Sequence, residues 1–172
     1  MMRRLGPVLI AFVVAIAVGC DGGNEESATQ PSPPATTQED REATLERTVR
    51  SALTANRRLS VYVLWNNRIP AWAGRSTRGP ALEGLRAAAA DRKRRGIRVR
   101  LLSDRFQVIS ITLDPSYTEA TAIARGRQRV RPYRLNGKPA GRSVELNEKA
   151  RIQLRRLGST NRFVVWRVEL LD

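Results

Sequence analysis

The segment TEATAIARGRQRVRPYRLNGKPAGRSVELNEKARIQLRRL, residues 118–157, decides the fold. Both of its halves alternate small or apolar residues with charged residues, which is the period of a half-buried strand. In the first half the alternation sets Ala122, Ala124, Gly126 and Val130 against arginines, and in the second half it runs through Val144, Leu146, Ala150, Ile152 and Leu154. The dipeptide Asn136-Gly137 between the halves favours a tight turn. The segment therefore predicts an antiparallel hairpin with one apolar face and one charged face.

Strand patterns also flank this hairpin. The stretches IRVRLLS and RFQVISITL, between residues 97 and 113, predict either two strands or one bent strand, and Asp114-Pro115-Ser116 predicts a turn after them. Residues 158–161 predict another turn before a last strand over 162–171, in which we expect Val164, Trp166, Val168 and Leu170 to share one face. The pattern predicts a meander of about four strands.

Two helices are predicted ahead of the strands. Leu45, Val49 and Leu53 recur at helical spacing within residues 41–66, and acids at the start of this segment suit the positive end of a helix dipole. The stretch LSVYVLW, 59–65, could continue the helix or form a strand; we favour helix because no turn signal precedes it. Residues 66–80 predict a loop with Trp72 packed on the core, and residues 80–95 a second helix. Helices followed by strands indicate an α+β fold.

Composition excludes several classes of site. The chain has no histidine and a single cysteine, Cys20, so it has no Ser-His-Asp triad, no intramolecular disulfide and no CxxC pair. We expect no metal site and no cofactor. The net charge is +15, and every basic residue except Lys93, Lys138 and Lys149 is arginine. This bias towards arginine indicates either recognition of anions by guanidinium groups or a GC-rich genome, and for the bias itself we favour the genome.

The first 20 residues read as a targeting segment. The basic MMRR is followed by the uncharged residues 5–19, which are short for a membrane-spanning helix and typical of a signal peptide. The phrase AVGC then resembles the lipobox of bacterial lipoproteins, although Ala17 stands where leucine is usual. The resemblance implies a signal peptide over 1–19, lipid attachment at Cys20 and a location on the extracytoplasmic face of the cell membrane. The alternatives are an ordinary secreted protein and an uncleaved anchor.

Residues 20–40 predict a disordered, lipid-anchored linker. The segment DGGNEESATQPSPPATTQED lacks long apolar side chains and cannot bury enough surface to fold. It holds five acids and no base, so the positive charge is concentrated in residues 41–172, which we expect to form one folded domain.

The element order resembles the nuclear transport factor 2-like (SnoaL-like) family, and more closely its lipoproteins from high-GC Gram-positive bacteria. The phrases that carry the resemblance, over residues 41–172, are GPALEGLRAAAADRKRRGIRVR, VISITLDPSYTEATAIAR and NRFVVWRVELL. The resemblance implies that the helices pack on a curved antiparallel sheet to form a cone with a pocket. It carries over fold and location but no active site.

Few residues qualify for chemistry inside such a cone. Asp104 could point inward as a lone acid, but we favour a surface turn position. We expect Tyr117 to be exposed at a loop tip and Tyr133 to be able to stack on an arginine. No catalytic residue is predicted.

The charged strand face is the sharpest surface feature. In an extended strand Arg125, Arg127, Arg129 and Arg131 lie on one face, about 7 Å apart in succession. A hairpin centred near Lys138 sets Glu145, Asn147, Lys149 and Arg151 beside them, so one acid faces six bases. We favour a solvated face whose long side chains cover the strands beneath. The alternative is an anion-binding surface formed by Arg125, Arg127, Arg129, Arg131, Lys149 and Arg151.

The function predicted from the sequence is a lipid-anchored, extracytoplasmic, non-enzymatic binding or scaffold domain of the cell envelope. Its membrane contact is the lipid on Cys20. The alternatives are a basic module that binds anionic lipid or wall polymer, and a cone-pocket enzyme that uses a carboxylate. An envelope protein is a further candidate partner. Nucleic acid is not expected, because the compartment is wrong and aromatic residues do not alternate with the arginines.

Overall fold

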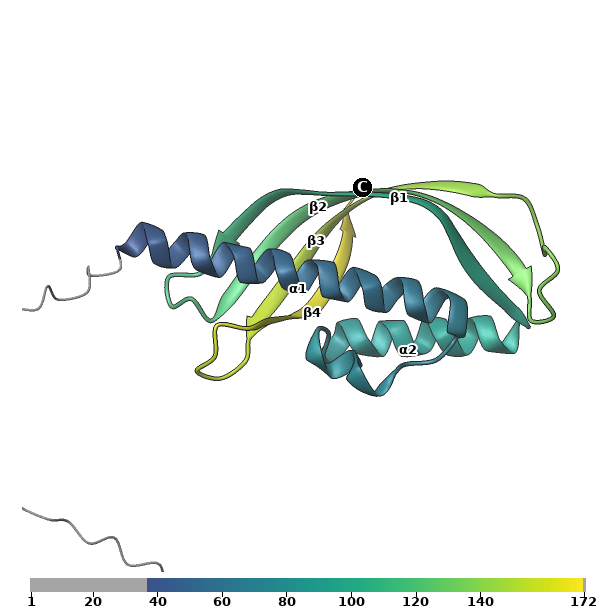
Figure 1. Ribbon diagram of the computed structural model, residues 1–172, viewed down its shortest axis with the longest axis horizontal. Helices are drawn as coiled ribbons and strands as arrows, with labels where there is room; N and C mark the ends of the chain where they lie inside the picture. The colour runs from purple at the N-terminus through teal and green to yellow at the C-terminus, as the bar shows by residue number, and fades with distance from the viewer. Residues whose placement is uncertain (1–36, 172) are drawn as a thin grey trace, which may run out of the picture. The chain divides into compact units, whose positions relative to one another are not determined.

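The chain folds as two helices followed by a four-stranded sheet. The computed structural model describes residues 37–171. The helices are α1 (Gln38–Asn66), the short 3-10 helix η1 (Ala71–Arg75) and α2 (Gly79–Arg94). The strands are β1 (Ile97–Leu113), β2 (Glu119–Arg134), β3 (Val144–Arg156) and β4 (Phe163–Leu171). Each strand pairs antiparallel with the next, in the order β1-β2-β3-β4 (Figure 1). The predicted α+β fold, with N-terminal helices on an antiparallel sheet, is confirmed.

Helix α1 begins three residues before the predicted Arg41 because a capping box starts it. The Thr37 side chain accepts a hydrogen bond from the Asp40 backbone N–H, and the Asp40 side chain accepts one from the Thr37 backbone N–H. This exchange satisfies two of the unpaired donors at a helix start. The helix runs on through LSVYVLW, as predicted, where Leu59 and Val63 are fully buried.

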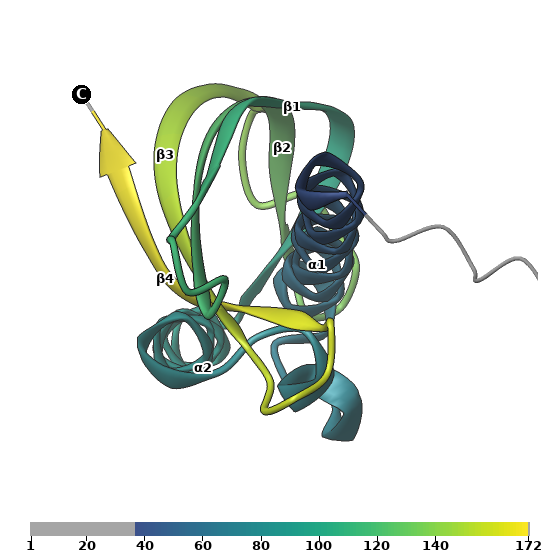
Figure 2. The ribbon, with the colours of Figure 1, turned by 90° about the vertical axis from the view of Figure 1, so that its left-hand side faces the viewer.

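The core lies between α1 and the inner face of the curved sheet. Figure 2, which looks along α1, shows the strands arching around this helix and α2 lying beside β4. Buried α1 residues pack with the inner face of β2, and their cluster includes Leu45, Val49, Leu53, Ala120, Ala122 and Ala124. Each buried leucine or valine contributes about 1.5–3 kcal/mol relative to exposure. The predicted apolar face of the hairpin is therefore the floor on which α1 packs.

The hairpin has the predicted inner and outer faces, but it centres on Gly137 instead of Lys138, so Arg151 lies opposite Ile123. Arg125 lies opposite Lys149, and Val130 lies opposite Val144. Asn136-Gly137 forms a tight turn in which Gly137 has φ +86° and its N–H donates to the Arg134 carbonyl at 2.9 Å. β1 is one long strand with two register shifts against β2, which decides between the one-strand and two-strand alternatives.

Two predictions about aromatic positions are wrong. In β4 the pairing shifts between Gln153 and Leu154, so the strict alternation of the last strand breaks. Phe163 and Val165, instead of Val164 and Trp166, belong to the main core cluster. Trp72 is 38% exposed and meets the ring of Tyr62 edge-on, with ring centroids 5.9 Å apart, so it lies at the edge of the fold.

Tyr117 ties the β1–β2 turn to α1, although it was predicted to be exposed. Its φ of +56° turns the side chain back, and its hydroxyl donates to Oε1 of Glu42 at 2.7 Å. This hydrogen bond lowers the pKa of the Glu42 carboxyl and raises the pKa of the Tyr117 hydroxyl. A contact across 75 residues of sequence has no local signal, so the turn pattern alone indicated a loop tip.

Gly79 should be essential to the join between α2 and β4. It has φ +53°, and a Cβ there would meet the Trp166 ring at 2.8 Å. Gly79→Ala should therefore lower the free energy of unfolding by about 2–4 kcal/mol, because backbone strain adds to the clash. Gly84→Ala in the same helix is the control. A Cβ at Gly84 meets nothing within 4 Å, so this variant should gain up to about 1 kcal/mol. Urea titration measures both, and equal stabilities would contradict the assignment.

Candidate functional site

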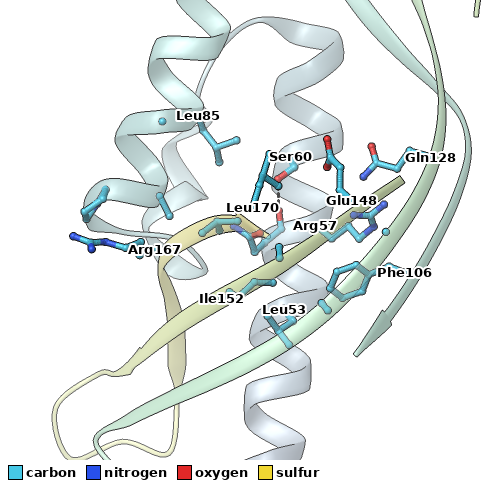
Figure 3. Close-up of a pocket in the computed structure, with 18 residues that line it drawn as sticks. Leu53, Arg57, Ser60, Leu85, Phe106, Gln128, Glu148, Ile152, Arg167 and Leu170 are labelled. Carbon is cyan, nitrogen blue, oxygen red and sulfur yellow. Dashed lines mark hydrogen bonds between the residues drawn. The ribbon is translucent and has the colours of Figure 1, made fainter. Parts of the chain in front are cut away.

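A half-open cavity of about 400 Å³ lies between the two helices and the inner face of the sheet (Figure 3). Most of its wall is apolar, and every helix and strand except η1 contributes to it. The apolar lining includes Leu53 from α1, Ala81 and Leu85 from α2, Phe106 from β1, Ala124 from β2, Ile152 from β3, and Val168 and Leu170 from β4. Apolar concave sites of this kind are typical of small-molecule binding.

The cavity exists because small residues stand where larger ones would fill it. The inner face of β2 continues from Ala124 to Gly126, and α2 presents Gly84 towards the same space. No atom lies within 4 Å of the Cβ position of Gly84. On β4, Leu170 is 67% exposed at the cavity, so this wall is partly open to solvent.

Polar side chains gather at one end of the cavity around Arg57 of α1 (Figure 3). The Arg57 guanidinium forms an ion pair with Asp104 of β1, and its Cζ lies 4.9 Å from the centre of the Phe106 ring. With the Gln128 amide turned to satisfy both groups, Nη2 of Arg57 donates to the amide oxygen at 3.0 Å. Arg57 is thus held in place by an acid, an amide and an aromatic ring.

One cation, Arg57, faces two carboxylates at this end, Asp104 and Glu148. Burial lowers the pKa of the Arg57 guanidinium, and the nearby Glu148 carboxylate opposes that shift. A guanidinium remains protonated near neutral pH even so. The Glu148 side chain makes no ion pair among residues 37–171 and also lines the cavity. A ligand entering the apolar part would therefore meet a hydrogen-bonding, charged end.

The sequence held a signal for this polar end that the prediction missed. Gln128 and Glu148 occupy inner-face positions of the two hairpin strands, where the alternation calls for apolar residues. Polar residues at core positions are departures that often mark function. Arg57 follows Leu53 by one helical turn on the buried side of α1. Which strand residues Arg57 would meet depended on the crossing of α1 over the sheet, which no local pattern determines.

Asp104 does not lie in the surface turn that we favour for it from the sequence. It is in the middle of β1, opposite Gln128, and its side chain is 24% exposed in the ion pair with Arg57. It points inward, which was the alternative, but its partner is an arginine. The bulge after Leu101 shifts the alternation of β1 by one residue, so the side chain of Asp104 points inward. A bulge is difficult to predict from sequence.

The predicted anion-binding residues separate into two groups. Arg125, Arg127, Arg129 and Lys149 are exposed on the outer face of the sheet, away from the helices. Arg131 is half-buried, donates to the Gly141 carbonyl at 3.2 Å and lies 5.9 Å from the Tyr133 ring centre, which matches the stacking expected for Tyr133. Arg151 pairs at 3.7 Å with Glu169, which it shares with Arg167.

Other kinds of site are not indicated by residues 37–171. This part of the chain holds no group of three or more side chains suited to a metal ion. None of its helices combines the length and the apolar character needed to cross a membrane. Cys20, the predicted site of lipid attachment, lies outside the described residues.

Comparisons with known proteins identify the fold and not the function. No family model matches the chain, and no curated protein matches it. Among solved structures, the intermembrane space region of the chloroplast protein ARC6 is similar with a TM-score of 0.60 at 15% identity, covering 73% of this chain and 95% of that one. A Catenulispora acidiphila protein aligns with a TM-score of 0.38 at 16% identity, covering 76% of this chain and 94% of that one. At such identities the first likeness shows a shared fold alone.

The Arg57–Asp104 pair should couple more strongly than exposed ion pairs do. In a double-mutant cycle of Arg57→Met and Asp104→Asn, we expect a coupling free energy of about 1–3 kcal/mol, since both side chains are three-quarters or more buried. The exposed Arg94–Asp91 pair is the control and should give about 0.5 kcal/mol or less. Urea denaturation measures both cycles. Coupling energies that do not differ would contradict the assignment.

Proposed function

We propose that the protein is a lipid-anchored, extracytoplasmic, non-enzymatic binding domain of the bacterial cell envelope that takes a small amphiphilic ligand into the cavity. One observation carries the proposal: a cavity of about 400 Å³ with a mostly apolar lining has a fixed polar group, Arg57, at one end. Ligand sites typically span about 300–1,000 Å³ and combine mostly apolar lining with a few placed polar groups. The apolar part of the ligand would lie against Ile152 and Leu170, and its polar end would face Glu148 and Gln128.

The arrangement around Arg57 favours binding over catalysis. Its guanidinium is committed to Asp104 and Gln128, so Asp104 is already neutralised, and within residues 37–171 Glu148 is the one carboxylate left unpaired in the cavity lining. Such a cluster orients a ligand well, because its members are fixed by one another before the ligand arrives. The resemblance to the nuclear transport factor 2-like lipoproteins agrees with a binding role. Membership of that family remains a proposal.

A cavity-filling variant tests the ligand site. Gly84→Phe should direct a ring into the cavity, because Gly84 lines the cavity and its Cβ position is open. Ala87→Phe puts the same side chain on the exposed side of α2 and is the matched control. Wild-type chain and control, purified from the native envelope, should retain a common small molecule, detected by mass spectrometry of an organic extract. The Gly84→Phe variant should retain at most a tenth of the amount that the wild-type chain retains. Such a loss corresponds to an affinity lowered at least tenfold, or by about 1.4 kcal/mol.

Two outcomes would contradict the cavity assignment. One is recovery of the same small molecule, in equal amount, from the Gly84→Phe variant. The other is that wild-type protein carries no small molecule that the filled variant lacks. Circular dichroism should show that both phenylalanine variants are folded, so that a lost ligand reports on the cavity.

The anchor is tested separately from the cavity. Cys20→Ser should abolish incorporation of a clickable fatty acid into the protein in growing cells, because a hydroxyl does not replace the thiol in thioether formation. Ser27→Ala in the same segment should leave the label unchanged. Intact mass should show a wild-type chain that begins at Cys20 and carries lipid. Labelled Cys20→Ser protein, or a mature wild-type chain that retains residues 1–19, would contradict the anchor.

A further inference from the structure

The outer face of the sheet places like charges directly opposite one another on paired strands. Between β1 and β2, Arg100 lies opposite Arg131 and Arg105 lies opposite Arg127. Between β2 and β3, Arg125 lies opposite Lys149. Like charges in direct cross-strand pairs are destabilising, by up to about 1 kcal/mol each. Three such pairs on one face therefore lower the stability of the sheet.

The surrounding side chains compensate only part of this charge. Glu145 pairs with Arg127 at 3.3 Å, and this is the acid that the hairpin supplies to the cluster. Among residues 37–171, the side chains of Arg100, Arg105, Arg125 and Lys149 form no ion pair and no side-chain hydrogen bond. A bound anion would relieve the repulsion that the protein itself leaves in place.

Part of this face is shaped to receive an anion. A shallow hollow of about 310 Å³ is lined by Ser103 and Arg105 of β1, Arg127, Gln128 and Arg129 of β2, and Glu145 of β3. Ser103 lies opposite Arg129 and Arg105 lies opposite Arg127, so a hydroxyl and three guanidinium groups surround one space. Guanidinium groups match the geometry of phosphate oxygens. Arg105 was not among the anion-binding residues expected from the sequence, and only the pairing of β1 with β2 places it in the hollow.

We propose that this outer face docks on anionic phospholipid headgroups, with one phosphate diester seated in the hollow. Glu145 lies within the hollow and repels a doubly charged free phosphate more strongly than a singly charged diester. No aromatic side chain alternates with these arginines, so the face lacks the stacking platform of a nucleic-acid site. On the same edge strand β1, Leu102 and Ile109 are 45% and 51% exposed, and exposed apolar side chains suit a bilayer interface. This proposal is independent of the cavity ligand.

The test uses the full chain in a zwitterionic detergent. Dihexanoyl phosphatidylglycerol is titrated against it by microscale thermophoresis, in parallel with dihexanoyl phosphatidylcholine, inorganic phosphate and a ten-nucleotide oligothymidine. The double variant Arg105→Gln, Arg129→Gln removes two charges from the hollow. The control Arg50→Gln, Arg86→Gln removes two exposed charges from α1 and α2, neither of which takes part in an ion pair among residues 37–171.

The expected result is tightest binding of phosphatidylglycerol, weakened about tenfold to thirtyfold in the hollow variant and less than threefold in the control. Raising salt should weaken wild-type binding further, because exposed charges are screened. The melting temperature of the hollow variant at low salt should be no lower than that of wild type, because the variant loses like-charge repulsion. If the two arginines had a purely structural role, the variant would melt at a lower temperature than wild type.

Other outcomes overturn the proposal. Equal weakening in both double variants would mean that net charge alone binds the lipid. Equal binding of phosphatidylcholine, or no binding of phosphatidylglycerol, would exclude an anionic-lipid surface. Inorganic phosphate bound as tightly as the lipid would indicate a free-anion site, and oligothymidine bound more tightly would indicate nucleic acid.

Discussion

The structure depends on how closely α1 can approach the central strand β2. Ala120, Ala122 and Ala124 stand at successive inner positions of β2, and each is at most 3% exposed beneath the helix. Larger side chains there would hold α1 away from the sheet and leave Leu45 and Val49 without a packed floor, because interiors tolerate little added volume. The sheet curves around the closely packed α1, and α2 lies beside β4 (Figure 2).

The candidate site arises where that packing ends. After Ala124 the inner face of β2 continues with Gly126 and then Gln128, so the apolar floor stops while α1 continues over it. The space is left open, and its far end is occupied by the interactions of Arg57 with Asp104, Gln128 and Phe106. The core and the cavity are thus two consequences of one strand, whose inner residues change from methyl groups to a glycine and an amide.

The same strand determines the opposite surface. Because side chains alternate, the small inner positions of β2 are interleaved with outward arginines, and the register of β1 and β3 places further bases beside them. A strand lined with bases on both sides concentrates charge that the fold offsets with few acids, Glu145 and Glu169 among them. The inner face is thereby mostly apolar and the outer face is positively charged.

The sequence by itself determined the class of fold, the antiparallel hairpin with its inner and outer faces, the continuation of α1 through residues 59–65 and the outward direction of Arg125, Arg127 and Arg129. These features rest on local periodicity, turn chemistry and capping, which neighbouring residues specify. Tertiary structure alone decided the bulges that redirect β4 and Asp104, the reach of Tyr117 to Glu42, the gathering at Arg57 and the addition of Arg105 to the outer face. Each of these depends on how elements distant in sequence cross or pair, and the packing of the whole core sets that geometry.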